Sequence, residues 1–282
     1  MWLPSKVALG WIRITHVCAS WRAIIIGHTH FWADWVLTFY SVDVVNTFLH
    51  RARDQLLVLD FDLLGHHCDL RALKSSVTEL IMQKDIWHRA RAVNCTSKHA
   101  GYRGYLPDLT RSLSNTTFVH LRKVVLFLPK EQGQLLGFRS PRVTELSLSS
   151  NARVTEEAPL SVFELDRIIE ECTMLSSLCL HRVVNTQLAL VPTCVPNGFK
   201  SHAFIRHLSI QTFDECMLQP ILQTFARQEE SEMCIEIFGP RDLARAVSFA
   251  STIYGWGHDT YYKVDLRDQS DSACGSDGAY LY

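Results

Sequence analysis

Residues 143–151 read Val-Thr-Glu-Leu-Ser-Leu-Ser-Ser-Asn, and this stretch decides the fold that the sequence predicts. Leu146 and Leu148 alternate with serines, which is the period of a strand with one apolar and one polar face. Val143 stands three positions before the first leucine, and Asn151 stands three positions after the second. The stretch therefore predicts a short strand that enters and leaves the core at fixed points.

The same spacing recurs along the chain, and it matches the leucine-rich-repeat pattern Leu-x-x-Leu-x-Leu-x-x-Asn. Partial copies begin at Val77, Leu121, Leu175 and Ile205, and a shorter one is Ile235-Glu-Ile237. The gap between Leu80 and Val124 is 44 residues, which is twice the 22-residue step from Val124 to Leu146. One further degenerate copy is therefore expected within residues 83–118.

Helical periodicity separates these strands. Ser161-x-x-Glu164 is a capping box before a helix with one apolar face, and further helices are expected after Thr212 and after Gly239-Pro240. The residues of the first helix face are Leu165, Ile168, Ile169 and Cys172. The alternation predicts an α/β fold, an irregular leucine-rich-repeat-like solenoid with parallel strands on its concave side and helices outside. A doubly wound α/β sheet is the alternative, although no glycine-rich phosphate loop follows any strand.

The N-terminal region is predicted to be helical. Residues at helical spacing form one apolar face that ends before Gly27, where glycine can adopt a left-handed conformation, and Trp32 then returns across that face. The residues of the face are Ile14, Val17, Cys18, Trp21 and Ile25. Ser41 is expected to cap a second helix, and a half-buried strand follows at residues 57–62. The apolar face of this second helix holds Val44, Val45, Phe48, Leu49 and Ala52.

Residues 7–37 resemble the second half of an F-box domain. The resemblance lies in Val17-Cys18-x-x-Trp21-Arg22, followed by Phe31-Trp32, and Leu9-Gly-Trp-Ile-Arg-Ile-Thr-His16 is similar to the variant common in mushroom-type fungi. It implies docking on a Skp-type adaptor within a cullin ubiquitin ligase. The residues implied for the adaptor-facing module are Val17, Cys18, Trp21, Arg22 and Trp32, with Trp21 expected in its core.

The start of the chain departs from the family pattern. F-box domains begin with Leu-Pro-x-Glu and a helix, whereas Leu3-Pro4 is followed here by Ser-Lys-Val. We therefore expect a partial F-box at 1–37, a repeat domain at 38–264, and an acidic, small-residue, disordered tail at 265–282.

Composition excludes several classes of function. The 282 residues carry a net charge of −1, which disfavours a nucleic-acid binder, and no apolar run reaches the length of a membrane-spanning helix. Nine cysteines without a Cys-x-x-Cys pair indicate reduced thiols in the cytoplasm or nucleus. The clusters His66-His67-Cys68 and His28-x-His30 lack a second ligand pair, so no metal and no cofactor are expected. No residue pattern marks a catalytic nucleophile, and we predict a protein that is not an enzyme.

The polar positions between the leucines define the predicted substrate surface, because in a repeat strand they face the open sheet. The predicted substrate-binding residues are Lys123, Phe127, Glu145, Ser147, His181, His207, Gln211, Glu236 and Phe238. Phe127 and Phe238 are expected to be exposed anchors. The resemblance implies a substrate-recognition subunit of a cullin ligase. Two alternatives are a repeat scaffold that no longer binds the ligase and an α/β enzyme with an unrecognised site.

Overall fold

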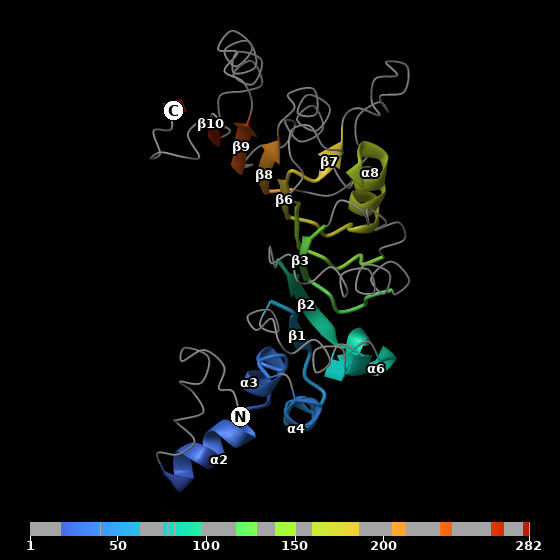
Figure 1. The fold of residues 1–282 in the computed structure, drawn as a ribbon, viewed down its shortest axis with the longest axis vertical. Coiled ribbons are helices and arrows are strands. Elements are labelled where there is room, and N and C mark those ends of the chain that lie inside the picture. The colour runs from blue at the N-terminus through green and yellow to red at the C-terminus, as the bar shows by residue number, and fades with distance from the viewer. Residues whose placement is uncertain are drawn as a thin grey trace.

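The computed structural model shows an α/β protein built on one large sheet with helices beside it (Figure 1). The residues that it describes are 18–39, 41–62, 76–77, 79–81, 83–96, 117–128, 139–150, 160–185, 205–212, 232–238, 261–267 and 279–281.

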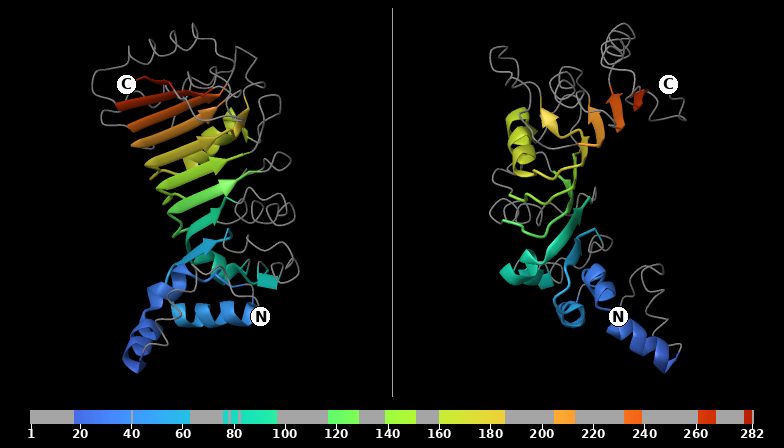
Figure 2. Two further views of the ribbon diagram at one scale, coloured as in Figure 1. Left: turned by 60° about the vertical axis from the view of Figure 1, so that its left-hand side comes forward. Right: turned by 180° about the vertical axis from the view of Figure 1, so that it is seen from behind.

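Nine strands of the described residues form this sheet, and eight of them run parallel while the last is antiparallel. They are β1 (Leu57–Asp60), β2 (Ala90–Cys95), β3 (Lys123–Phe127), β4 (Glu145–Ser149), β6 (Ser177–His181), β8 (His207–Thr212), β9 (Glu232–Phe238), β10 (Tyr261–Arg267) and β11 (Ala279–Leu281). Their order in space follows the chain, so each strand is added to the same growing edge (Figure 2). A doubly wound sheet needs a reversal of strand order, and the described strands contain none.

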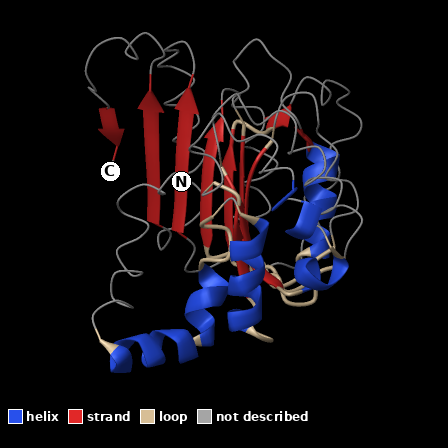
Figure 3. Cartoon of the chain, turned by 60° about the horizontal axis from the view of Figure 1, so that its bottom comes forward, coloured by secondary structure: helices blue, strands red, loops and turns tan. Residues whose placement is uncertain are grey.

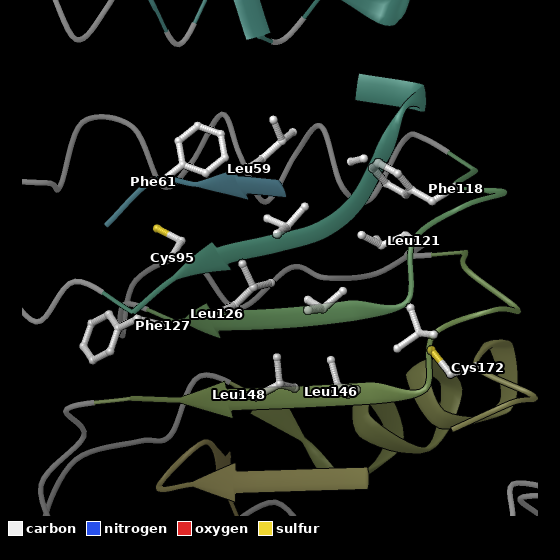
Figure 4. Close-up of a cluster of buried hydrophobic side chains, with 14 of the residues drawn as sticks. Leu59, Phe61, Cys95, Phe118, Leu121, Leu126, Phe127, Leu146, Leu148 and Cys172 are labelled. Carbon is white, nitrogen blue, oxygen red and sulfur yellow. The ribbon is translucent and has the colours of Figure 1, made fainter. Parts of the chain in front are cut away.

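The register places apolar residues of neighbouring strands opposite one another in two buried rows. One row is Leu59, Val93, Val124, Leu146, Leu178 and Leu208, and the other is Cys95, Leu126, Leu148, Leu180 and Ile210. Figure 4 shows Leu126, Leu146 and Leu148 together in this core. The leucine spacing of the sequence thus produces a continuous apolar face, because every strand repeats it in the same register.

Helices α6 (Lys84–His88) and α8 (Val162–Glu171) lie on one side of the sheet (Figures 1 and 2). Beside α8 runs a small parallel pair, β5 (Leu160–Ser161) and β7 (Val184–Asn185). The predicted apolar face of α8 is confirmed, since Leu165, Ile168, Ile169 and Cys172 are all buried in the same core as the strand leucines. No helix of the described residues covers the opposite face of β3, β4, β6 and β8.

The β1 end of the sheet carries helices α3 (Thr29–Asp34) and α4 (Val42–Ala52). The predicted inner face of α4 is confirmed, with Val45, Phe48 and Ala52 buried. Trp32 packs on Phe48 with their ring centroids 5.0 Å apart. Ser41 is the N-cap residue of α4, but its side chain makes no capping hydrogen bond.

One predicted strand copy is a helix, and the hidden copy is a strand. Residues 76–77 and 79–81 are helical, with Val77 and Ile81 both buried one turn apart. The expected degenerate copy within 83–118 is confirmed as β2, whose Val93 pairs with both Leu59 and Val124.

The C-terminal boundaries also differ from those predicted. Leu208 pairs with Met233, so Ile235 takes the second apolar position of β9 and not the first. The disordered tail was predicted to cover residues 265–282. Residues 265–267 instead belong to strand β10, and residues 279–281 form strand β11. Residues 268–278 lie outside the described residues, as do the helices expected after Thr212 and after Gly239-Pro240.

Candidate interaction surfaces

Helix α2 (Ala19–Gly27) presents an uncovered apolar surface. None of its residues is buried, and Trp21, Ile24 and Ile26 are 52%, 64% and 42% exposed. Trp21 and Ile24 are three residues apart and share a face of α2, whereas Ile26 lies on the other side of the helix from Ile24. We call Trp21 and Ile24 the α2 patch. The prediction of a buried helix with Trp21 in the core is wrong, because no residue of α2 is buried and, of its residues, only the half-buried Ile25 packs against the core. Figure 3 shows α2 extending away from the other helices.

The junction between α2 and α3 is held by Trp32. Its indole Nε1 donates hydrogen bonds to the carbonyl oxygens of Ile25 at 3.0 Å and Ile26 at 3.2 Å. Trp32 was predicted to return across the apolar face of the preceding helix; its indole instead contacts the backbone at the end of that helix, and Trp21 of the predicted face stays exposed. Gly27 is the last residue of α2, but its φ is not in the left-handed region. The C-cap residue is His28, whose N–H donates to the carbonyl of Ile25.

The residues implied for the adaptor-facing module therefore separate into two groups. Trp21, Arg22 and Cys18 are exposed, and Cys18 caps α2 by accepting a hydrogen bond from the backbone N–H of Trp21 at 3.5 Å. Trp32 is buried and anchors the helix junction. Val17 lies outside the described residues.

The polar face of the sheet, which we call the open face, is organised in rows. Cα partners in successive strands give Lys123, Glu145, Ser177 and His207 in the first row; Val125, Ser147, Cys179, Ser209 and Cys234 in the second; and Phe127, Ser149, His181, Gln211 and Glu236 in the third. Eight of the nine predicted substrate-binding residues fall in these rows, and Phe238 continues β9 two positions beyond Glu236. The side chains of Gln211, Glu236 and Phe238 lie outside the described residues.

The predicted substrate-binding residues whose side chains are described differ in their exposure, and so in their access to a partner. Lys123 and Glu145 are opposite each other and form an ion pair of 2.7 Å, with side chains 48% and 51% exposed. Phe127 is only 7% exposed and belongs to the hydrophobic core, so the prediction of an exposed anchor at this position is wrong. Figure 4 shows its ring at the end of β3. Apart from Val125 and the buried Phe127, the described side chains of the open face are therefore polar or cysteines.

A thiol and an imidazole meet at the centre of the open face. Cys179 Sγ lies 3.0 Å from His181 Nε2. Partial burial alone would raise the pKa of Cys179, but the hydrogen bond and the charge of His181, with hydrogen bonds from Ser147 and Ser209, outweigh burial and lower the pKa. The leucine alternation places Cys179, between Leu178 and Leu180, on the same predicted surface as His181, but it does not predict their contact. The available signal was their spacing, because residues two apart in a strand share a face.

The buried thiols behave in the opposite way. Burial, reinforced by Asp62 and Asp60, raises the pKa of Cys95 to about 12, and burial next to Glu171 raises that of Cys172 to about 12. These two thiols stay protonated and inert at neutral pH. Cys179 is thus chemically distinct from the cysteines that fill the core.

The described residues form neither a metal site nor a membrane-spanning helix. They contain no group of three or more His, Cys, Asp or Glu side chains able to hold a metal ion. None of their helices combines the length and the apolar composition that crossing a bilayer requires. Comparisons of the whole chain found no matching family model, no similar curated protein and no similar solved structure.

Proposed function

We propose that this chain is a non-catalytic substrate-recognition subunit of a cullin-type ubiquitin ligase, acting in the cytoplasm or nucleus. In this proposal, the α2 patch binds a Skp-type adaptor and the open face binds a protein substrate. The observation that carries it is the α2 patch, in which Trp21 and Ile24 are exposed one turn apart on the same helix face.

The exposure of these side chains favours a protein partner. Large apolar residues that gather on one element, without cover, are typical of interaction sites, and tryptophan contributes strongly to such interfaces. One residue of the patch, Trp21, also belongs to the stretch that resembles an F-box, and Arg22 of that stretch follows it directly. The rigid junction made by Trp32 supports this role, because it fixes α2 against the rest of the chain without using the patch.

The sheet supports the second half of the proposal. Strands added one after another in a constant register, with helices on one side, are the expected arrangement of a leucine-rich-repeat-like solenoid. Such a sheet offers side chains at a fixed step of about 4.8 Å from strand to strand. Serines hold many positions of the open face, so a bound backbone could approach closely between the charged and histidine side chains.

The experiment is co-purification of the full chain with a Skp-type adaptor from a mushroom-forming fungus. We expect a one-to-one complex, which the double variant Trp21→Ala with Ile24→Ser abolishes while the chain stays folded. The matched control is Met174→Ala, which removes an equally exposed apolar side chain (58% exposed) from the turn after α8. It should leave the complex intact.

The outcomes separate the proposal from its alternatives. A folded chain that does not bind the adaptor would leave the repeat scaffold, in which only the open face is used. A complex that survives the Trp21 and Ile24 changes would show that the adaptor binds elsewhere. For the enzyme alternative, the specific observation is the Cys179–His181 pair, whose reactivity is tested separately below.

A further inference from the structure

Cys179 and His181 on β6 form a pair whose geometry the proposed ligase role does not require. Cys179 and His181 point to the same side of one strand, with Sγ and Nε2 3.0 Å apart. Ser147 on β4 and Ser209 on β8 are the Cα partners of Cys179, so a hydroxyl flanks the thiol on each side. One imidazole and two serines therefore lie beside one sulfur in the middle of the open face.

The surroundings favour the thiolate form at this sulfur. A thiolate accepts the hydrogen bonds of His181, Ser147 and Ser209 more strongly than a thiol does. The other titratable side chains described around the pair are Glu145 on β4 and His207 on β8, each in the adjacent row, and Cys234 on β9, one strand beyond Ser209. None of them lies between Cys179 and His181.

We propose that Cys179 is a site of covalent modification, oxidised by hydroperoxides to a sulfenic acid with His181 as the proton donor. The thiolate attacks one oxygen of the peroxide, so that an S–O bond forms as the O–O bond breaks. Sulfur loses two electrons to the departing oxygen. That oxygen takes the Nε2 proton of the His181 imidazolium, which is left as neutral imidazole, and leaves as water, or as an alcohol when the oxidant is an organic peroxide.

The pair explains the choice of oxidant. An alkylating electrophile needs only a thiolate, whereas cleavage of an O–O bond also needs a proton at the departing oxygen. His181 holds its Nε2 atom 3.0 Å from the reacting sulfur, which puts a proton donor next to the site of attack. Cys179 is half-buried between two serine-bearing strands, which admits a small oxidant more readily than a bulky one.

The oxidised form should persist until a small thiol reaches it. Cys234 is in the same row as Cys179 but two strands away, a Cα separation of about 10 Å from the strand spacing. A disulfide needs Cα atoms within about 7 Å, so this neighbour cannot resolve the sulfenic acid. The product is therefore expected as a trappable sulfenic acid or as a mixed disulfide with a low-molecular-weight thiol.

The test uses the reduced full chain, hydrogen peroxide and dimedone, with the label on each cysteine quantified by peptide mass spectrometry. We expect Cys179 to be labelled faster than Cys18, which is the more exposed of the two. His181→Asn should slow labelling of Cys179 by about tenfold or more at neutral pH, because each unit of rise in thiol pKa lowers the thiolate fraction tenfold. The inflection of the rate against pH should move upward in the same variant.

The matched control is His120→Asn, which removes an exposed histidine remote from β6 and should leave the rate unchanged. Circular dichroism establishes that each variant is folded, and Ser209→Ala, which removes one hydroxyl donor, replaces His181→Asn if that variant does not fold. Equal labelling of Cys179 and Cys18, or an unchanged rate in a folded His181→Asn variant, would overturn the proposal. The adaptor is absent from this experiment, so its result is independent of the ligase proposal.

Discussion

Helix α2 and the core next to it carry similar apolar residues, but these residues are buried in the core and exposed on α2. Trp32, one helix further along, is 3% exposed, whereas Trp21 is 52% exposed. Both tryptophans stand in sequences with clear helical periodicity. The comparison teaches that periodicity identifies the face of an element, while burial depends on which other element the chain brings against it.

The largest effect is expected from the core side of this comparison. Trp32→Ala should lower the free energy of unfolding by about 3–5 kcal/mol, since it removes a buried ring that packs on Phe48. It also removes the two hydrogen bonds to the end of α2. Urea unfolding followed by circular dichroism measures the loss. A change under about 1 kcal/mol would mean that α3 and α4 do not form this contact in solution.

A second prediction concerns the covered thiols of the same core. In the unfolded chain Cys95 ionises near its ordinary pKa of 9.0, while in the folded protein its pKa is about 12. The unfolded state therefore releases this proton first, and the free energy of unfolding falls as the pH rises from 9 to 12. The expected slope from this thiol is about 1.4 kcal/mol per pH unit.

Other groups also titrate at high pH, but they are the same in the parent protein and in the Cys95→Ala variant. The difference between the two pH dependences therefore isolates the slope that Cys95 contributes. Unfolding by urea at several pH values between 9 and 10.5 should give a shallower pH dependence for the variant. Cys172 provides an independent repeat of the test, since its pKa is also about 12. Identical slopes in the variants and the parent protein would show that these thiols are accessible to water.

Substitutions on the open face should have an effect on stability between that of the core and that of the α2 patch. Lys123 and Glu145 form an ion pair whose side chains are about half exposed. A double-mutant cycle with Lys123→Ala and Glu145→Ala should give a coupling energy of no more than about 1 kcal/mol, which decreases with added salt. A larger, salt-insensitive coupling would mean that the pair is covered, and the open face would then be unsuited to a substrate.

The repeat strands could be predicted from the sequence, because the alternation of leucine with small polar residues survives in each of them. The limit of such prediction is visible in the tetrapeptide Val-Thr-Glu-Leu, which occurs at residues 77–80 and again at 143–146. In the second copy Leu146 begins the alternation of β4, and both strand leucines are buried. In the first copy Val77, Glu79 and Leu80 are helical.

The residues that follow each tetrapeptide account for the difference. Leu80 is followed directly by apolar Ile81, which is buried together with Val77 at helical spacing, whereas Leu146 is followed by a serine and then by Leu148. Strand β2 was foreseen only from the length of the gap, because Val93 and Cys95 take the places of the two leucines there. Contacts across the sheet, such as that of Cys179 with His181, depend on side-chain conformations that a spacing does not determine.

The smallest effect on stability is expected at the α2 patch, from the double variant Trp21→Ala with Ile24→Ser. Surface substitutions that break no packing change the free energy of unfolding by no more than about 0.5 kcal/mol. Urea unfolding alongside Trp32→Ala makes this a matched pair of tryptophan deletions, and the same variant serves in the adaptor experiment. If its loss equalled that of Trp32→Ala, the patch would be packed in solution, and the ligase proposal would lose the observation on which it rests. A near-neutral change together with lost adaptor binding would instead assign the exposed residues of α2 to a partner and the buried Trp32 to the fold.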